Sequence, residues 1–220
     1  MKNIVIDDVL AQIKVPIPKT LNGCFRVRQI QAGQIVLWQG EPVEEVQLLV
    51  QGELLIEAQF PSGNSLIFSS ENGVSVLGDI EILSENLTYA STVIAKTDIV
   101  LLTLSIENFQ NWMQEEPEFQ SMVIRSLAKK CYRQSTNQGV MTYIPPVRRL
   151  ARFLAEELVR NPSPSGIVRC SHAELGRRTG MSERTVNRAL SELRNMNVIH
   201  TEYGKIYADE PKLHEILADL

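Results

Sequence analysis

The chain has 220 residues, of which 44% are hydrophobic, and a net charge of −4, so it can bury a full core in one or two domains, and two are expected. It contains no run of about 18 apolar residues and no basic-then-apolar leader, which argues against membrane spanning and secretion and predicts a cytoplasmic protein. The cysteines, Cys24, Cys131 and Cys170, are odd in number and form no CxxC pair, so we expect reduced thiols rather than a disulfide framework or a metal site.

The first half of the chain is predicted to change from irregular structure to β-strands near residue 25. Residues 1–22 show no clear periodicity beyond a short helix over about residues 7–13. After them, short β-rich runs alternate with turn signals, which is typical of an antiparallel sandwich or barrel. About eight strands are expected, the number in a jelly roll, with apolar side chains such as Trp38 filling the interior. The clearest runs are residues 35–38, 46–50, 53–60, 65–68, 92–95 and 99–104.

A long helix is predicted to follow the strands. Residues 105–113 form a first helix, which ends before Pro117, and a second helix runs over residues 118–142. Positions along the second helix repeat three and four apart, which is a heptad seam and favours a parallel homodimer. A helix that lies on its own barrel is the alternative. The seam consists of Ile124, Leu127, Cys131, Gln134, Gln138 and Met141.

A pair of prolines is predicted to end the long helix. Pro145 and Pro146 form a hinge, because a proline biases the residue before it away from helical geometry. A further helix is expected over residues 147–159. The loop over residues 161–166 is rich in Pro and Ser and leads to the next pair of helices.

Residues 170–199 are predicted to form two short helices joined by a sharp turn. Ser171 and Glu174 have the spacing of a capping box, so the first helix begins at His172. Ser182 is the N-cap of a second helix, whose apolar positions recur at helical spacing. The other face of that helix is polar and basic, as expected of a helix that reads base edges in a major groove.

Small residues and charge favour a DNA-binding helix-turn-helix over a helix pair that has only a structural role. Gly180 ends the first helix, and Gly176 supplies the small residue that two steeply crossing helices need. Residues 198–207 then read as a hairpin with glycine in its turn, in the position of a wing. Residues 145–220 carry 12 Lys and Arg against 10 Asp and Glu, net +2, whereas residues 1–144 carry 10 against 16, net −6.

Three short motifs of the sequence resemble motifs found in one family of regulators. They are Gly33-Gln34-Ile35 with Gly40-Glu41 and Gly52, then Gly78-Asp79-Ile80-Glu81-Ile82-Leu83, and finally Ser182-Glu183-Arg184-Thr185-Val186-Asn187-Arg188. With the order of the predicted parts, they resemble the Crp/Fnr family of bacterial transcription regulators over essentially the whole chain.

The resemblance implies an α+β fold in three parts. Residues 1–116 form a jelly-roll barrel like a cyclic-nucleotide-binding domain, residues 117–144 a dimerisation helix, and residues 145–220 a winged helix-turn-helix. It also implies an allosteric regulator that is not an enzyme. Such a protein binds double-stranded DNA at a two-fold-symmetric site as a homodimer through residues 118–142, contacts RNA polymerase if it is an activator, and has no membrane partner.

The residues of the barrel argue against a cyclic nucleotide as the effector. In the family, the phosphate is held by backbone amides and an arginine at the start of a short helix, while a carboxylate takes the ribose hydroxyl. Asp79 stands where that carboxylate stands, but Glu81 replaces a small residue and Tyr89 replaces the arginine. The Gly-Asp-Ile-Glu form is similar to the YeiL-like branch, whose ligand the sequence does not reveal. An effector is expected at Gly78, Asp79, Ile80, Glu81, Tyr89, Ala90, Ser91, Gln134 and Ser135.

Other cofactors fit the sequence no better, and the effector stays unknown. An iron-sulfur cluster needs several cysteines near the N-terminus, where only Cys24 lies, and haem needs a histidine in the barrel or long helix. The histidines His172, His200 and His214 follow both, which also argues against a cupin-type enzyme fused to a DNA-binding tail. Two alternatives stay open: an effector-independent regulator with a structural barrel, and a module whose winged domain binds only proteins.

The second helix of the helix-turn-helix provides the expected DNA contacts. Arg188 matches the arginine that family members use on guanine, and Arg184 replaces a glutamate that many of them use on cytosine. Asn187 is a candidate for adenine, and Glu183 either contacts the DNA or braces an arginine. The full expected set is Ser171, Ser182, Glu183, Arg184, Asn187 and Arg188, with Arg177 and Arg178 placed for the phosphate backbone.

Overall fold

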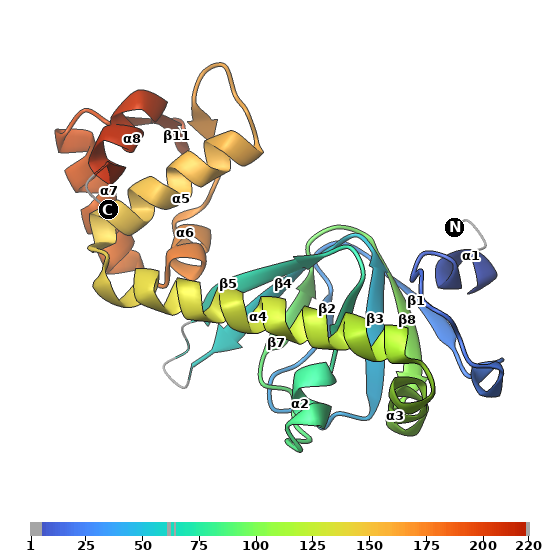
Figure 1. The fold of residues 1–220 in the computed structure, drawn as a ribbon. Coiled ribbons are helices and arrows are strands. Elements are labelled where there is room, and N and C mark those ends of the chain that lie inside the picture. Colours follow the sequence, from blue (N-terminus) through green and yellow to red (C-terminus); the bar gives the residue numbers. More distant parts are fainter. Residues whose placement is uncertain (1–5, 61–62, 64, 219–220) are drawn as a thin grey trace. The chain divides into compact units, whose positions relative to one another are not determined.

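The computed structural model describes residues 6–60, 63 and 65–218, with side chains for these except Asp7 and residues 136–143 (Figure 1). The chain divides into two compact units. The barrel unit comprises Met1–Gln59 and Phe68–Gln134, and the C-terminal unit comprises Phe60–Ile67 and Ser135–Leu220. Each unit has its own hydrophobic core.

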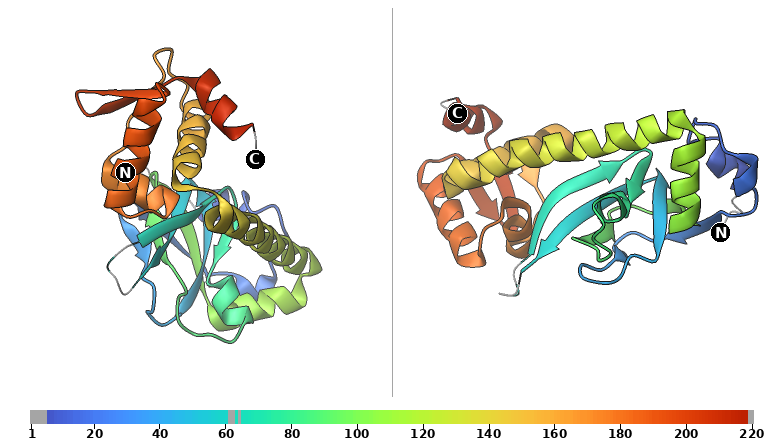
Figure 2. Two further views of the ribbon diagram at one scale, coloured as in Figure 1. Left: turned by 90° about the vertical axis from the view of Figure 1, so that its left-hand side faces the viewer. Right: turned by 60° about the horizontal axis from the view of Figure 1, so that its bottom comes forward.

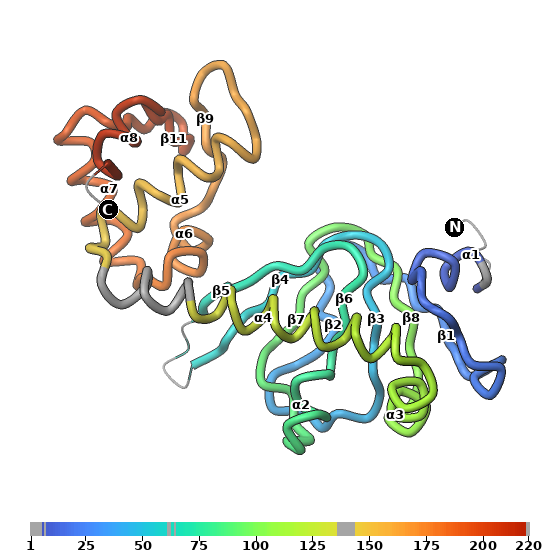
Figure 3. The backbone as a smooth tube through the Cα atoms, in the orientation of Figure 1, coloured from blue at the N-terminus to red at the C-terminus, as the bar shows by residue number. Residues whose placement is uncertain are grey.

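The barrel unit is built from two four-stranded sheets, which confirms the predicted jelly roll. One sheet has the order β1-β8-β3-β6 and the other β2-β7-β4-β5, and the pairs whose register is described are antiparallel. The tube in Figure 3 follows β6 alongside β3. The strands are β1 (Arg26–Ile30), β2 (Ile35–Leu37), β3 (Glu45–Gln51), β4 (Glu53–Gln59), β5 (Ser65–Asn72), β6 (Ser75–Leu77), β7 (Thr92–Ala95) and β8 (Ile99–Ser105).

The central strands β3 and β8 are apolar on both faces because both faces are covered. Five consecutive residues of β3 and six of β8 are buried, so neither strand shows the alternation of a half-exposed strand. The strand β1 does alternate with polar residues, and β6 has only three residues, so neither gave one of the clearest apolar runs.

Helices precede the barrel strands, lie between β6 and β7, and follow β8. They are α1 (Ile6–Leu10), the 3-10 turn η1 (Lys19–Leu21), α2 (Asp79–Leu83), α3 (Ile106–Glu115) and α4 (Pro117–Tyr143). The break before Pro117 and the long helix after it are therefore confirmed, as is a short N-terminal helix, which begins and ends earlier than predicted. The right-hand view of Figure 2 shows α4 lying along the barrel strands.

The core beside α3 is an aromatic cluster centred on Trp112. Its ring stacks on Phe119 with centroids 3.8 Å apart and meets Phe25 edge-on at 5.5 Å. Trp112 Nε1 donates a hydrogen bond of 2.8 Å to the Pro16 carbonyl, which satisfies the buried indole N–H. The prediction that Trp38 belongs to the core is wrong, because its side chain is 46% exposed just after β2.

The long helix α4 turns one face to its own barrel and leaves another exposed. Phe119 and Val123 are fully buried against the barrel core, and Leu127 is half-buried at its edge. Ile124 is 56% exposed. Of the predicted seam, the side chains of Gln138 and Met141 lie outside the part of the chain that the structure describes.

The C-terminal unit contains the predicted helices and hairpin together with two elements that were not predicted, β9 and α8. The small sheet has the order β10-β11-β9. The core is formed mainly by α5 and α7, with Leu150, Leu154, Val186 and Leu190 buried. The elements are α5 (Pro146–Arg160), β9 (Ile167–Val168), α6 (His172–Thr179), α7 (Glu183–Asn195), β10 (Ile199–Glu202), β11 (Lys205–Ala208) and α8 (Glu210–Leu217).

The two tryptophans provide a test of the barrel core. Trp112→Ala should lower the free energy of unfolding by about 3 to 5 kcal/mol, because it removes a fully buried ring and leaves a cavity. Trp38→Ala is the matched control and should cost less than about 1 kcal/mol, since that ring is half in water. Urea denaturation followed by circular dichroism measures both. Equal losses for the two variants would contradict this description of the core.

Candidate functional site

The ends of α6 and α7 are fixed by capping residues: a serine begins each helix, and a glycine ends the first. The Ser171 hydroxyl accepts a hydrogen bond of 3.1 Å from the Glu174 N–H at the start of α6, and the Ser182 hydroxyl accepts one of 3.2 Å from the Thr185 N–H at the start of α7. Gly180 ends α6 in the left-handed conformation, with φ 66° and ψ 33°. These contacts confirm the helix boundaries that the sequence predicts.

Gly176 is required where the two helices approach. A β-carbon at this position would lie 2.7 Å from the Met181 carbonyl oxygen, closer than such atoms approach in proteins. The absence of a side chain therefore lets the turn pass directly over α6. The crossing of α6 and α7 depends on this close contact, as the sequence predicts.

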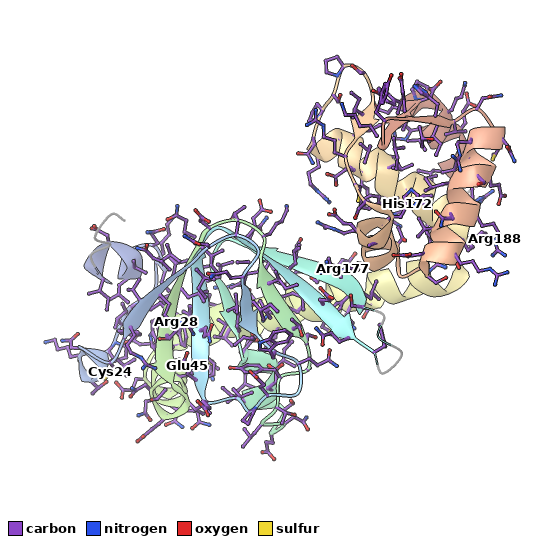
Figure 4. The ribbon with its side chains drawn as sticks, turned by 180° about the vertical axis from the view of Figure 1, so that it is seen from behind. Cys24, Arg28, Glu45, His172, Arg177 and Arg188 are labelled. Carbon is purple, nitrogen blue, oxygen red and sulfur yellow. The ribbon has the colours of Figure 1, made fainter. Side chains whose placement is uncertain are left out.

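The outer face of α7 is polar, basic and exposed. Val186, Ala189, Leu190 and Leu193 are buried on the inner face. Figure 4 shows Arg188 projecting outward from α7. Neither Arg184 nor Arg188 forms an ion pair within the described residues, so both guanidinium groups are available to a ligand. The exposed residues of the predicted contact set are Ser171, Ser182, Glu183, Arg184, Asn187 and Arg188.

The two arginines of α6 are less exposed than those of α7. Arg177 and Arg178 lie in the last turn of α6 and are half-buried. Arg178 Nη2 is 3.8 Å from Glu174 Oε1, and its side chain is only 18% exposed. The structure therefore separates the predicted set into six exposed residues and two that lie partly inside the unit.

A hairpin follows α7 and has the form predicted for a wing. The strands β10 and β11 pair antiparallel, with His200 opposite Tyr207, and these two rings stack 4.6 Å apart. Arg194 of α7 donates a hydrogen bond of 3.4 Å to the Thr201 hydroxyl, which ties the helix to the hairpin. Tyr203, at the turn, is 92% exposed.

The second candidate site is the short helix α2 of the barrel unit. It begins after Gly78, whose φ of 87° favours glycine. Asp79 is almost fully buried, and the Lys130 ammonium of α4 lies 2.7 Å and 2.8 Å from its two oxygens. Lys130 also donates a hydrogen bond of 2.6 Å to the Val76 carbonyl. Burial raises the pKa of Asp79, and the charge of Lys130 opposes this shift.

Glu81, two residues along α2, is also buried but has a different partner. Its Oε1 accepts a hydrogen bond of 3.0 Å from the Ala90 N–H, in the segment that precedes β7. The neighbouring Tyr89 hydroxyl donates a hydrogen bond of 3.4 Å to the Glu45 carbonyl. Burial raises the pKa of Tyr89 to about 12, and the charges of Glu45 and Glu81 add to the shift.

The predicted effector residues are only partly brought together. Asp79, Glu81, Tyr89 and Ala90 meet around α2, whereas Ile80 is 46% exposed. Gln134 and Ser135 are both exposed. Lys130 of α4 contacts α2 through Asp79.

Basic residues on the inner face of α4 were missed from the sequence. Lys130 holds Asp79, and Arg133 donates to the Ser70 carbonyl at 2.9 Å and pairs with Glu71 at 2.5 Å. Elsewhere in the barrel unit, Glu45 of β3 accepts hydrogen bonds from Arg26 and Arg28 of β1, and Figure 4 shows Arg28 beside Glu45. The signal for Lys130 was available, because it falls on the same helical face as the buried Val123, seven positions earlier.

Among the described residues, no three His, Cys, Asp or Glu side chains lie close enough to hold a metal ion. The same part of the chain contains no helix with the length and apolar character needed to cross a bilayer. Burial raises the pKa of the Cys170 thiol to about 12, and Glu174 adds to the shift, so this thiol stays protonated at neutral pH.

Family comparisons match both units. Residues 27–116 match the cyclic nucleotide-binding domain, and residues 148–216 match the Crp-like helix-turn-helix domain. The first match covers the barrel strands and α2, and the second covers the helix-turn-helix and its hairpin.

Individual relatives align with most of the chain. The global nitrogen regulator of Synechococcus elongatus is 26% identical over 197 residues, which cover 85% of this chain and 87% of the relative. The CRP-like cAMP-activated global transcriptional regulator of Mycobacterium tuberculosis is 23% identical over 176 residues, which cover 77% of this chain and 78% of the relative.

Solved structures share the fold at low sequence identity. A transcriptional regulator of the Crp/Fnr family from Eubacterium rectale superimposes with a TM-score of 0.77 at 15% identity, covering 91% of this chain and 93% of its own. The c-di-GMP responsive global regulator CLP of Xanthomonas campestris gives a TM-score of 0.74 at 19% identity, covering 84% and 94%.

Proposed function

The chain belongs to the Crp/Fnr family of transcription regulators, and on that premise we propose that it binds a two-fold-symmetric DNA site as a homodimer. Like its relatives, it is a DNA-binding regulator and not an enzyme. The observation that carries the proposal is the exposed face of α7, where Arg184 and Arg188 project from a helix that is capped and packed on its other side.

The exposed residues of α7 have the chemistry to distinguish base pairs. An arginine can donate two hydrogen bonds to guanine O6 and N7, so Arg184 and Arg188 each favour a guanine. Asn187 matches the donor and acceptor of adenine. Glu183 lies at the same end of the helix and is exposed. Ser182 and the α6 N-cap Ser171 complete the proposed contact set, and Arg177 and Arg178 of α6 are assigned to the phosphate backbone, which orients the helix but carries no sequence information.

A substitution at Arg184 tests this assignment. Arg184→Ala should relax the preference at one position in each half-site, because a good bidentate pair is worth about 1 to 3 kcal/mol of discrimination. Selection of bound sequences from random duplexes, compared with wild type, measures the effect. Arg178→Ala is the comparator, since loss of a phosphate contact weakens binding to all sequences alike. It also lowers the slope of log affinity against log salt concentration by about one. An unchanged consensus for Arg184→Ala would show that this side chain does not read a base.

The exposed face of α4 supports dimerisation. At about 100° per residue, Ile124 and Cys131 share a face that lies roughly 80° to 140° from the buried Phe119 and Val123. Leu127 falls between the two faces, which agrees with its partial burial. Ile124 is therefore a large apolar side chain on the side of α4 away from the barrel, where a second copy of α4 can cover it. The two recognition helices of a dimer must also lie about 34 Å apart to reach successive major grooves.

A charge at Ile124 tests the dimer. Ile124→Glu should give monomers with weakened DNA binding, because two carboxylates would face one another across the seam. Lys129→Glu, which also adds a negative charge to an exposed position of α4 but outside the seam, should remain dimeric. Light scattering at tens of micromolar protein, roughly where a specific dimer persists, measures both. A monomeric wild type under these conditions would refute the proposal.

The barrel is proposed not to bind cyclic nucleotides, in contrast to the cAMP-activated relative from Mycobacterium tuberculosis. Calorimetry with cyclic AMP and cyclic GMP should show no saturable binding in the micromolar range. The reason is that a phosphate beside the buried Glu81 carboxylate, with Tyr89 in place of a cation, would cost several kcal/mol. Micromolar binding of either nucleotide would overturn this part of the proposal.

The remaining assignments follow from the proposed function. We assign residues 1–116 to the barrel domain, 117–144 to the dimerisation helix and 145–220 to the winged helix-turn-helix. A chromosomal DNA target requires a cytoplasmic location, and an activator would also contact RNA polymerase. Membership of the YeiL-like branch stays a prediction. A module that binds only proteins is the alternative, and salt-dependent binding to DNA fragments distinguishes it.

A further inference from the structure

We propose that Glu81 is a built-in substitute for an anionic ligand. Its carboxylate fills the barrel site and keeps the regulator able to bind DNA without a small effector. This inference rests on the proposed function and deepens it. It names the occupant of the barrel site, a side chain of the same chain. The proposal also favours the alternative of an effector-independent regulator over a regulator that is controlled by an effector in the barrel.

The first support is the position of the Glu81 carboxylate. The side chain is 9% exposed, and its Oε1 accepts a 3.0 Å hydrogen bond from the Ala90 N–H. No basic side chain pairs with Glu81 within the described part of the chain. A backbone N–H that points at a carboxylate is the same kind of donor that holds a phosphate oxygen. The donor that an anionic ligand would use is therefore already taken by an anion.

The second support is that α2 is held on two sides. Asp79 and Glu81 are two residues apart, so on a helix of 3.6 residues per turn they point about 200° apart. Asp79 faces α4, where the Lys130 ammonium contacts both of its oxygens. Glu81 faces the segment before β7 and bonds to Ala90. The helix α2 thus joins α4 to that segment through two buried carboxylates.

The segment that Glu81 holds is closed by backbone contacts as well. The Asn86 N–H donates a hydrogen bond of 2.9 Å to the Glu81 carbonyl, so the turn after α2 folds back on the same residue. The Tyr89 N–H donates at 2.9 Å to the Glu41 carbonyl, and the Gly40 N–H donates at 2.8 Å to the Tyr89 carbonyl. Glu81 therefore adds a side-chain contact to a segment that is already tied to the barrel on its other side.

The tether makes Glu81 a strong competitor of any free anion. A carboxylate held in place by its own chain has an effective concentration of at least millimolar order, and it requires no loss of translational freedom on binding. A second anion would also have to approach a buried negative charge. Through Glu81 on one side and Asp79 with Lys130 on the other, α2 therefore links the segment before β7 to α4 without a ligand.

Two variants and a control test the role of Glu81 in the full-length protein. Glu81→Ala removes the carboxylate, and Glu81→Gln keeps an oxygen that can accept the Ala90 hydrogen bond. Glu85→Gln removes an equal charge from an exposed position in the following turn. Each protein is refolded from denaturant and desalted, so that no bound small molecule is carried over. Amide hydrogen exchange at Ala90 and affinity for the selected DNA site are then measured.

Wild type and Glu85→Gln should bind the site without any added effector and should protect the Ala90 amide, whereas Glu81→Gln, which keeps an acceptor but loses the charge, should protect the amide less well and bind the site more weakly than wild type. Glu81→Ala should exchange this amide at least about tenfold faster and bind DNA about tenfold more weakly, as expected for loss of one buried charge-assisted hydrogen bond. Its thermal melting is recorded to show that it remains folded. If Glu81→Ala does not fold, reduced protection and affinity in Glu81→Gln still support the proposal, and values equal to those of wild type in that variant overturn it.

Other outcomes separate this inference from the proposed function. Unchanged exchange and DNA affinity in Glu81→Ala would overturn the inference while the proposed function stands. Wild type that binds its site only after a small-molecule fraction of cell extract is added would also overturn it. Wild type that binds no duplex under any condition would refute the proposed function and effector-independent binding together. The exchange rate at Ala90 would then decide whether Glu81 fills the anion position.

Discussion

The buried ion pair between Asp79 and Lys130 is the contact on which the arrangement of the barrel unit depends. It joins residues 51 apart in sequence, and its ammonium also satisfies the Val76 carbonyl. Removing one partner of such a pair leaves an uncompensated buried charge, at a cost of about 3 to 5 kcal/mol. The pair lies on the same face of α4 as the buried Phe119 and Val123, so Ile124 lies on another face, where the proposed second copy of the helix would pack.

The helix-turn-helix depends on a different kind of interaction, which is local. Its helix ends are set by Ser171, Gly180 and Ser182, and its crossing is set by Gly176. None of these contacts involves the barrel unit, so the shape of the DNA-reading surface is specified within the C-terminal unit alone. The two units therefore divide the proposed function: the C-terminal unit provides the contacts to DNA, and the barrel unit with α4 provides the pairing of two chains.

The same distinction explains which features could be predicted from the sequence. The helices α6 and α7 and the hairpin after them were predicted closely, because caps, glycines and apolar periodicity lie within a few residues of one another. The contact between Lys130 and Asp79 was not, since periodicity on one helix does not show what lies opposite it. Trp38 was assigned to the core because an apolar residue at the end of a strand gives no sign of which face is covered. Glu81 was recognised as unsuited to a phosphate, but its bond to Ala90 required the structure.

The central claim is that this chain is a dimeric DNA-binding regulator whose barrel needs no small ligand. The most direct measurement is a selection from random duplex DNA with the full-length protein refolded from denaturant and desalted. A dimer that needs no ligand should enrich a two-fold-symmetric consensus, with half-sites about one helical turn apart, roughly 34 Å. No enrichment by this protein, or enrichment of a single unpaired half-site, would refute dimeric, ligand-independent binding.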